Sequence, residues 1–295
     1  MRSLLFVPGD SERKLAKGLA SGADCLLIDL EDSVALDNKD TARAVTAAFL
    51  AANVKTASRP RLYVRVNALD TGLTDGDLDA VMAGAPDGIM LPKSISGRDV
   101  QHLDAKLAVR EAECGLADGA TRILVVATET AASLFNLGSY QDASPRLEGL
   151  TWGGEDLSAD IGALANRDAS GAYTDPYRLA RSLCLFGAAA AGVMPIDSVF
   201  TGFRDMEGLR TEALDALRDG FTAKMAIHPA QVPVINEVFT PSEEEVARAE
   251  RIIEAFRAAG DPGVVGLDGE MLDRPHLRRA EKVIARARMA AAPAP

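Results

Sequence analysis

Residues 123–129, ILVVATE, place five aliphatic residues in a row, followed by a threonine and a glutamate. An uninterrupted aliphatic run of this length predicts a β-strand buried on both faces, because a half-exposed strand alternates apolar and polar residues. Strands of this kind are typical of parallel sheets that are covered by helices. The segment therefore predicts a parallel strand whose carboxyl end carries an acidic side chain.

Similar short apolar runs alternate with longer, amphipathic, alanine-rich stretches along most of the chain. The expected strands cover residues 4–7, 25–30, 61–66, 88–91, 123–127, 149–152, 195–199 and 224–227. Helical patterns between them cover residues 11–20, 39–50, 77–82, 99–113, 176–191 and 209–219. Eight such units in a chain of 295 residues predict an α/β fold, a closed (β/α)8 TIM barrel with right-handed crossovers. An open, doubly wound sheet is the alternative.

The pattern changes near residue 240, so we expect a barrel domain of residues 1–239 and a C-terminal extension of residues 240–295. Ser242 and Glu245 have the spacing of a capping box and predict the start of a helix that ends near residue 260. Residues 263–269 then indicate a short strand and a turn, and residues 275–288 a basic helix. This extension is expected to pack on the barrel or to act as a lid. The last residues, AAPAP, are expected to fray.

The charge balance restricts the possible partners. The chain has 43 acidic and 32 basic residues and a net charge of -11, which argues against binding to nucleic acid or to an anionic membrane. An anionic substrate would need a local cationic pocket or a metal ion. The three cysteines are dispersed, no apolar run approaches the roughly 20 residues of a membrane helix, and the N-terminus lacks a signal-peptide pattern. We therefore expect a cytoplasmic protein.

Two acidic residues follow neighbouring expected strands, where the reactive groups of such barrels lie. Glu129 follows the strand at 123–127, and Asp156 follows the turn after the next strand. Two carboxylates with few soft ligands nearby suit Mg²⁺, which keeps several waters and needs only one or two protein carboxylates. Alternatively, each carboxylate could cap the helix that follows it. The residues alone leave both interpretations open.

Further charged residues follow the other strands. Arg65 suits a substrate carboxylate or carbonyl, although it could instead form a structural ion pair with Asp29 or Glu31. The acids Asp29, Glu31 and Asp32 could bind metal-bound waters, or they could cap a helix and neutralise Arg65.

Basic residues on the first helix and other polar groups at strand ends are weaker candidates. Arg13 and Lys17 lie one helical turn apart and could bind a phosphorylated ligand or remain a solvated pair. Lys93, Asp197 and His228 also follow expected strands. The sequence has no evident Ser/His/Asp set, Walker loop or dinucleotide fingerprint. The charged strand ends therefore remain the candidates for function.

Several ordered motifs resemble one family. LFVPGDSERKL (5–15), LLIDLEDSV (26–34), YVRVNALDT (63–71), WGGEDLSADIG (152–162), VFTGFRDMEGL (199–209) and GLDGEMLDRP (266–275) closely resemble the citrate lyase β-subunit-like proteins of the HpcH/HpaI aldolase and citrate lyase group. The resemblance spans essentially the whole chain. It implies a (β/α)8 barrel assembled as a homotrimer or hexamer. It also implies a Mg²⁺-dependent carbon–carbon lyase that acts on acyl-CoA or acyl-carrier thioesters, such as citryl, malyl or citramalyl thioesters, with an oxaloacetate-like keto acid as a partner molecule.

The resemblance also implies roles for individual residues. Glu129 and Asp156 become the metal ligands, Arg65 a contact to the substrate oxygens, and Asp29, Glu31 and Asp32 the support for metal-bound waters. Phe6 and Arg13, and more weakly Lys17, correspond to contacts with CoA, while Asp273 corresponds to an acid/base residue supplied by the tail of a neighbouring subunit. One departure is Ile95, which stands where many relatives have an acid and leaves open how Lys93 is neutralised.

Two other functions stay open at this stage. The chain could be a non-catalytic subunit that binds CoA or an acyl carrier within a complex, or a metal-dependent aldolase acting on free pyruvate-derived acids. The spacing of residues does not choose among the thioesters, because one methyl or carboxymethyl group is distinguished by the shape of a pocket.

Overall fold

The protein is an α/β barrel, as the sequence predicts. The computed structural model describes residues 1–56 and 59–291. Of the end that was expected to fray, residues 291–295, only residue 291 is described, and it is the last residue of a helix. The strands of the barrel are β1 Ser3–Pro8, β2 Cys25–Asp29, β3 Arg61–Arg65, β4 Gly88–Leu91, β5 Arg122–Val126, β6 Leu147–Thr151, β7 Met194–Asp197 and β8 Ala223–Ala226. They pair in this order, and β1 closes the barrel by pairing in parallel with both β2 and β8. The prediction of a closed barrel is confirmed, and the open sheet is excluded.

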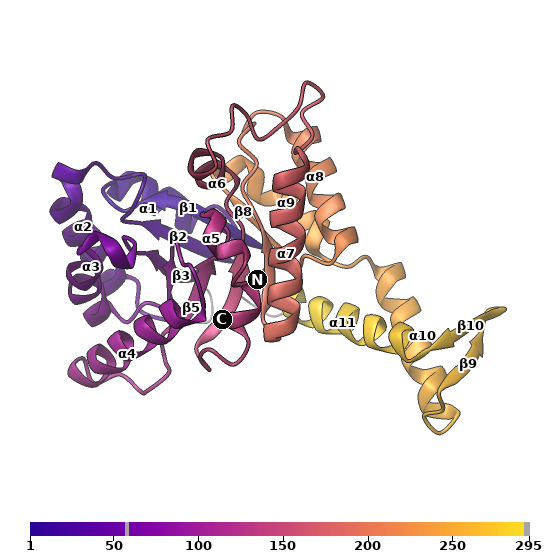
Figure 1. The fold of residues 1–295 in the computed structure, drawn as a ribbon. Helices are drawn as coiled ribbons and strands as arrows, with labels where there is room; N and C mark the ends of the chain where they lie inside the picture. Colours follow the sequence, from indigo (N-terminus) through magenta and orange to yellow (C-terminus); the bar gives the residue numbers. More distant parts are fainter. Residues whose placement is uncertain (57–58, 292–295) are drawn as a thin grey trace.

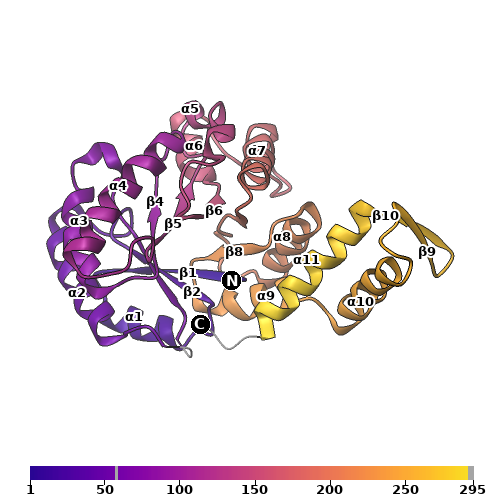
Figure 2. The same cartoon turned by 90° about the horizontal axis from the view of Figure 1, so that it is seen from below.

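Helices surround the strands (Figures 1 and 2). They are α1 Glu12–Leu19, α2 Lys39–Ala52, α3 Thr74–Val81, α4 Gly97–Glu113, α5 Ala131–Leu134, α6 Gly154–Asp160, α7 Asp175–Ala191, α8 Met206–Asp219 and α9 Val232–Phe239. Short 3₁₀ turns are η1 Leu36–Asn38, η2 Leu69–Thr71, η3 Met82–Gly84, η4 Leu137–Tyr140 and η5 Pro229–Gln231. The helical patterns missed α5 and α6, which are too short to show a clear period, and also missed α9. Among the described residues, no helix is long and apolar enough to span a membrane.

The barrel buries side chains on both sides of its sheet, which explains the uninterrupted apolar runs. One cluster fills the interior and includes Leu27, Tyr63 and Ile196. A larger cluster lies between the sheet and the helices and includes Ile28 and Val64. Alternate residues of each strand therefore point inward and outward.

The C-terminal extension has a small core of its own. It consists of α10 Glu243–Ala258, the antiparallel hairpin of β9 Val264–Leu267 and β10 Glu270–Asp273, and α11 Arg274–Ala291. The expected capping box starts α10: Ser242 Oγ accepts from the Glu245 N–H at 3.1 Å, and the Glu245 carboxylate accepts from the Ser242 N–H at 2.8 Å. Strand β10 was not expected. Phe256 and Leu272 belong to a buried cluster that joins α10, the hairpin and α11. Figures 1 and 2 show this extension projecting to one side of the barrel, with the hairpin at its far end.

Candidate functional site

Five neighbouring strands bring charged residues to the same end of the barrel, which we call the mouth. Asp29 and Arg65 are the last residues of β2 and β3. Lys93 follows β4, Glu129 follows β5, and Asp156 lies in the first turn of α6, directly after β6. Because the strands are parallel, their carboxyl ends meet on one face of the barrel. The strand order thus gathers residues that are up to 127 positions apart in the sequence.

Arg65 forms a paired ionic contact at the mouth. Its Nε and Nη2 donate to the two carboxylate oxygens of Asp29, each at 2.7 Å, and its Nη1 lies 3.1 Å from Glu31 Oε2. The guanidinium also lies over the ring of Phe6, with Cζ 4.7 Å from the ring centroid. Burial opposes the charged form, but the hydrogen bonds and charges of these acids raise the pKa of Arg65. The ion pairs with Asp29 and Glu31 are confirmed, and they hold a permanent positive charge in a fixed direction.

Asp29 and Glu31 differ in how completely their charges are compensated. Asp29 accepts hydrogen bonds from the backbone N–H groups of Glu31 and Ser33 as well as from Arg65, and these outweigh burial and lower its pKa. For Glu31, burial prevails over the nearby positive charges and raises the pKa. Glu31 Oε2 is buried, and its contact with Arg65 lacks the geometry of a hydrogen bond. Asp29 therefore caps the turn after β2 and not α2, whose N-cap is Asn38 without a side-chain hydrogen bond. Glu31 retains an acceptor oxygen without a donor.

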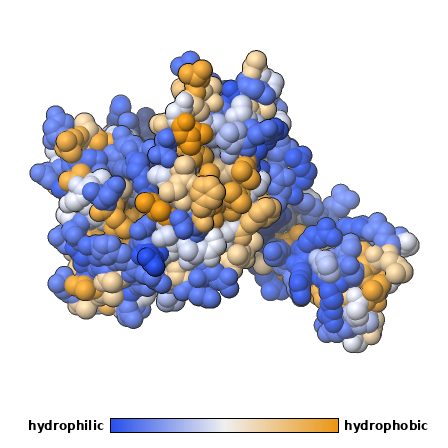
Figure 3. All heavy atoms as spheres, in the orientation of Figure 1, coloured by the Kyte–Doolittle hydropathy of each residue, from blue (hydrophilic) through white to orange (hydrophobic). Residues whose placement is uncertain are grey.

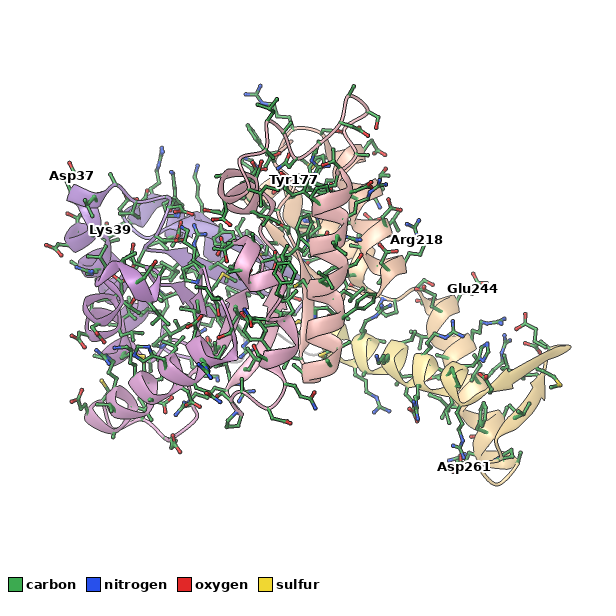
Figure 4. All side chains as sticks on the ribbon, viewed as in Figure 1. Asp37, Lys39, Tyr177, Arg218, Glu244 and Asp261 are labelled. Carbon is green, nitrogen blue, oxygen red and sulfur yellow. The ribbon has the colours of Figure 1, made fainter. Side chains whose placement is uncertain are left out.

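A buried lysine underlies this acidic turn. Lys39, which is labelled in Figure 4, begins α2, and its Nζ donates to the backbone carbonyl oxygens of Leu30 and Glu31 at 2.6 and 2.7 Å. The ammonium supports the backbone that carries Glu31 and Asp32. It helps to fix the turn without neutralising the side-chain carboxylates directly.

Lys93 lies between the acidic turn and the residues that follow β5 and β6. Its Nζ lies 2.5 Å from Glu31 Oε1, 3.3 Å from Asp32 Oδ1 and 3.7 Å from Asp156 Oδ1. Burial opposes the charge, but the hydrogen bond that Lys93 donates to Glu31 and the charges of the nearby acids raise the pKa of Lys93. Ile95 stands aside and is 46% exposed, so Lys93 is neutralised by acids of other strand ends. From the sequence, Lys93 was noted as a residue that follows a strand, and how it is neutralised was left open.

Glu129 is a buried carboxylate with a single described hydrogen bond. It is 4% exposed, and its Oε2 accepts from the backbone N–H of Lys93 at 2.5 Å. Burial is the main cause that raises the pKa of Glu129 to about 8, and the negative charge of Asp156 adds to it. Gly153 provides the space for this side chain, since a Cβ at that position would lie 2.7 Å from Glu129 Cγ.

The structure does not support the alternative in which Glu129 and Asp156 cap the helices that follow them. The N-cap of α5 is Thr130, whose hydroxyl accepts from the Ser133 N–H at 3.2 Å. The N-cap of α6 is Gly153, and no side chain caps that helix. Within the described part of the chain, neither Glu129 nor Asp156 accepts a hydrogen bond from the helix that follows it.

The composition of the mouth fits a hard divalent cation. Five carboxylates, those of Asp29, Glu31, Asp32, Glu129 and Asp156, gather at the mouth, and in the described part of the chain only Arg65 and Lys93 form side-chain ion pairs with them. In the described ranges, no three His, Cys, Asp or Glu side chains form a ready set of ligands. The donors therefore do not fit a metal held by protein alone, such as structural zinc. They fit Mg²⁺, which takes most of its ligands from water and substrate.

Comparison with known proteins identifies the family. Residues 2–229 match the family described as HpcH/HpaI aldolase/citrate lyase. The chain belongs to this family. It is 35% identical to the citrate lyase subunit beta-like protein of Mycobacterium tuberculosis over 96% of this chain and 94% of that protein. It is also 35% identical to a (3S)-malyl-CoA thioesterase of Cereibacter sphaeroides, over 99% of this chain and 96% of that protein.

A solved structure of the family matches nearly the whole chain. Protein CitE from Mycobacterium tuberculosis, in complex with magnesium, acetoacetate and coenzyme A, matches with a TM-score of 0.76 and 36% identity. The match covers 97% of each chain, so the relative includes a counterpart of nearly every part of this molecule. The family resemblance drawn from the motifs is confirmed.

A cavity of about 410 Å³ opens beside Arg65 in this member of the family. The polar side chains of Asp29, Asp32, Ser33 and Arg65 line one part of it. Phe6, Pro8, Val199 and Ile227 line the rest. A cavity with a charged part and an apolar part suits a ligand that carries both kinds of group.

The basic residues of α1 face solvent. Helix α1 begins four residues after β1 ends, and Arg13 and Lys17 are both exposed on it. Neither forms an ion pair with any other side chain in the described ranges. Their charges are therefore available to a ligand or to solvent.

Asp273 lies far from the mouth of its own chain. It ends β10, is exposed, and its Oδ1 lies 2.5 Å from His276 Nδ1; this hydrogen bond lowers the pKa of Asp273. Figures 1 and 2 both place the hairpin at the far end of the extension, well away from α6, which carries Asp156. The chain alone does not bring Asp273 to Glu129 and Asp156.

Asp197 does not belong to the mouth, although it ends a strand. Ile196 points into the barrel interior, so Asp197 points outward toward the helices. There it pairs with Lys224 at 2.6 Å and Arg181 at 3.3 Å, and it accepts from Trp152 Nε1 at 2.8 Å. Asp197 is a structural residue of the outer layer.

Proposed function

We propose that this chain is a Mg²⁺-dependent carbon–carbon lyase that cleaves a 3-hydroxyacyl thioester into a keto acid, or related acid, and an acetyl thioester. The observation that carries the proposal is the buried Glu129 carboxylate beside Asp156, at a mouth where carboxylates outnumber cations. Relatives named for citrate lyase and malyl-CoA activities, and a relative solved with magnesium, acetoacetate and coenzyme A, support it. In reverse, the same groups would condense the two products.

Glu129 and Asp156 would hold the metal. When bound, Mg²⁺ supplies Lewis-acid polarisation of a substrate oxygen. The acids Asp29, Glu31 and Asp32 line the adjacent turn, where they would accept hydrogen bonds from water bound there. Asp29 is already engaged with Arg65, so Glu31 and Asp32 are the freer acceptors.

Arg65 would stabilise the negative charge that develops on the substrate oxygen during cleavage. Its two bonds to Asp29 fix the guanidinium before substrate arrives, so little reorganisation is needed at the moment of reaction. Phe6 lies against the guanidinium face and limits the access of water to it.

Asp273 of a neighbouring chain would carry out the proton transfers. It would remove the hydroxyl proton, and the O–H electron pair would form the new carbonyl as the carbon–carbon bond breaks. The electrons of that bond would pass into a thioester enolate, which Asp273 would then protonate on carbon. In the single chain the hydrogen bond with His276 lowers the pKa of Asp273, so contact with the neighbouring mouth would have to exclude water and raise this pKa toward the working pH for efficient proton transfer.

The thioester would bind along α1. Phe6 lines the cavity, and Arg13 and Lys17 would contact the phosphate groups of CoA, or of an acyl carrier, from the exposed face of the helix. Such local cations are needed because the net charge of -11 repels an anionic ligand at long range.

We propose that the chain forms a homo-oligomer, a trimer or a hexamer, because Asp273 could act only at the mouth of a neighbouring chain. The surface of the barrel also offers an apolar face for contact. Phe135 is 91% exposed, and Leu179 and Phe186 of α7 are exposed beside it. Figure 3 shows apolar residues gathered over α5 and α7. Exposed apolar patches of this kind mark interaction surfaces.

The deciding experiment is a coupled assay of the purified protein alone on citryl-CoA, malyl-CoA and citramalyl-CoA, with and without Mg²⁺. We expect cleavage of at least one thioester that is lost when EDTA removes the metal. Binding of CoA without turnover would favour the non-catalytic subunit, and turnover of free keto-acid adducts without a thioester would favour the aldolase.

A further inference from the structure

Lys93 connects the two halves of the mouth. Its ammonium contacts Glu31 and Asp32 from the turn after β2, and it lies 3.7 Å from Asp156 on the far side. Its backbone N–H meanwhile donates to Glu129. One residue thus touches both acids to which the proposed function assigns the metal and two of the acids around them.

The backbone of Lys93 is held in an unusual conformation. Its φ of 51° lies in the left-handed region, which residues other than glycine rarely occupy. Such conformations persist only where the surroundings determine them. The hydrogen bond to Glu129 is one such constraint, and from this backbone the Lys93 side chain reaches the acids of the mouth.

We propose that the Lys93 ammonium competes with the divalent cation for the carboxylates of the mouth, and so sets the metal affinity of the protein. This inference rests on the metal site of the proposed function. Without metal, Lys93 supplies the positive charge that Glu31, Asp32 and Asp156 require. A cation that binds Asp156 must overcome the repulsion of the ammonium or displace it.

The direction of the effect follows from charge alone. Two cations that share carboxylates in a partly buried site repel each other much more strongly than they would in water. Removing the ammonium leaves the acids with fewer partners, and this deficit favours metal binding. If Lys93 instead served to hold the carboxylates in position, its removal would weaken metal binding.

The test compares metal affinities and needs no activity measurement. We would titrate Mg²⁺ into the full chain by calorimetry, and Mn²⁺ by electron paramagnetic resonance, for wild type, Lys93→Met and Lys93→Arg. Lys106→Met is the matched control, since Lys106 pairs with Asp75 on the surface at 2.8 Å. Methionine and arginine suffer the same strain as lysine at this φ, so the variants differ mainly in charge.

We expect Lys93→Met to bind both metals more tightly, on the order of tenfold, while Lys93→Arg and Lys106→Met stay close to wild type. Equal or weaker binding by Lys93→Met would overturn the inference and leave the metal site standing. Absence of binding by the wild type as well would overturn the metal site itself.

A second measurement on the wild type covers the case in which Lys93→Met does not fold. An amine-reactive reagent is applied with and without Mg²⁺, and the modification of Lys93 is followed by mass spectrometry. Displacement of the ammonium by metal predicts faster modification of Lys93, with Lys106 unchanged. Slower or unchanged modification of Lys93 at saturating metal would contradict the proposal.

Discussion

At the scale of single residues, the mouth depends on a few close contacts around Glu129. This carboxylate is nearly inaccessible, and Gly153 makes room for it. A buried carboxylate with one hydrogen bond contributes little to folding, because burial penalises its charge. The burial of Glu129 is therefore better explained by a role in ligand binding than by a contribution to the stability of the fold.

Substitution of the proposed ligands separates these two roles. We expect Glu129→Gln and Asp156→Asn to lower the affinity for Mg²⁺ at least about a hundredfold, because each removes one of two proposed anionic ligands. The free energy of unfolding should change by less than about 1 kcal/mol, since neither carboxylate caps a helix. Calorimetric metal titration and urea unfolding measure the two effects. A large loss of stability with metal binding intact would restore the capping interpretation.

Gly153 offers a test that leaves every charge in place. In Gly153→Ala, the added methyl group would lie 2.7 Å from Glu129 Cγ, so the carboxylate must move. We expect metal affinity and turnover to fall at least about tenfold, because a shift of about 1 Å in a ligand group has a large effect. Gly138→Ala is the control, since a Cβ there meets nothing within 4 Å. Equal metal affinity in both variants would show that the close approach of Gly153 is not needed.

At the scale of elements, the direction of each strand's last side chain decides its role. Arg65 and Asp29 point into the mouth, whereas Asp197 at the end of β7 points outward and neutralises Lys224, which is fully buried. Burial alone would raise the pKa of Asp197, but the charges of Lys224 and Arg181 outweigh it and lower the pKa. The ion pair therefore connects β7 and β8 to α7 and contributes to stability.

The pH dependence of stability follows from this shift. The pKa of Asp197 is lower in the folded than in the unfolded state, so the unfolded state binds more protons in the acid range. The contribution of Asp197 is thus present above the unfolded pKa of about 3.9 and is lost as pH falls through the folded value. Asp197→Asn should remove this part of the acid dependence, as followed by urea unfolding between neutral and acid pH.

The same variant should be destabilised at neutral pH. Breaking a buried ion pair from one side costs about 3–5 kcal/mol, although Glu212, at 3.0 Å from Lys224 Nζ, retains part of the interaction. Asp219→Asn is the matched control, because Asp219 pairs with Arg181 in a partly exposed position. This substitution should lower the free energy of unfolding by less than about 1 kcal/mol. If Asp197→Asn lowers the free energy of unfolding no more than the control does, the ion pair of Asp197 with Lys224 is not stabilising.

At the scale of the whole molecule, the charge is divided unevenly. Ten of the 43 acidic and nine of the 32 basic residues lie in the extension, which leaves a net charge of -10 on residues 1–239 and -1 on residues 240–295. Several exposed arginines of α11, such as Arg278 and Arg288, have no acidic partner in the described part of the chain. A nearly neutral extension with free basic groups can approach an acidic barrel of a second copy without strong repulsion.

Mixed oligomers test whether Asp273 acts across chains. Asp273→Asn should abolish turnover and leave metal binding intact, and Glu129→Gln should abolish turnover through the mouth. When the two inactive chains are co-expressed, the mixed species should recover up to about a third of wild-type activity, because in a mixed trimer one intact mouth of three meets an intact neighbouring tail. Tandem purification through two different tags isolates the mixed species for the assay. Mixed oligomers as inactive as either parent would remove the neighbouring tail from the mechanism.

Much of the fold was predictable because barrels bury their strands on both faces. The eight aliphatic runs appear in the structure within a few residues of their expected positions, and the capping box of α10 was visible in its residues. The short helices α5 and α6 were missed, because four and seven residues are too few to establish a helical period. Strand β10 was missed because it is mostly exposed.

Local sequence alone placed Glu129, Asp156, Arg65 and the acids after β2 at the ends of strands, because the apolar runs that precede them are local features. It did not determine which way a strand's last side chain points, since a run buried on both faces shows no alternation. Only the tertiary structure showed that Asp29 faces the mouth whereas Asp197 faces the outer helices. It also showed that Lys93 contacts acids from three other strand ends. The hairpin that carries Asp273 lies far from the mouth of its own chain. These are relations between distant segments, and the closure of the barrel determines them.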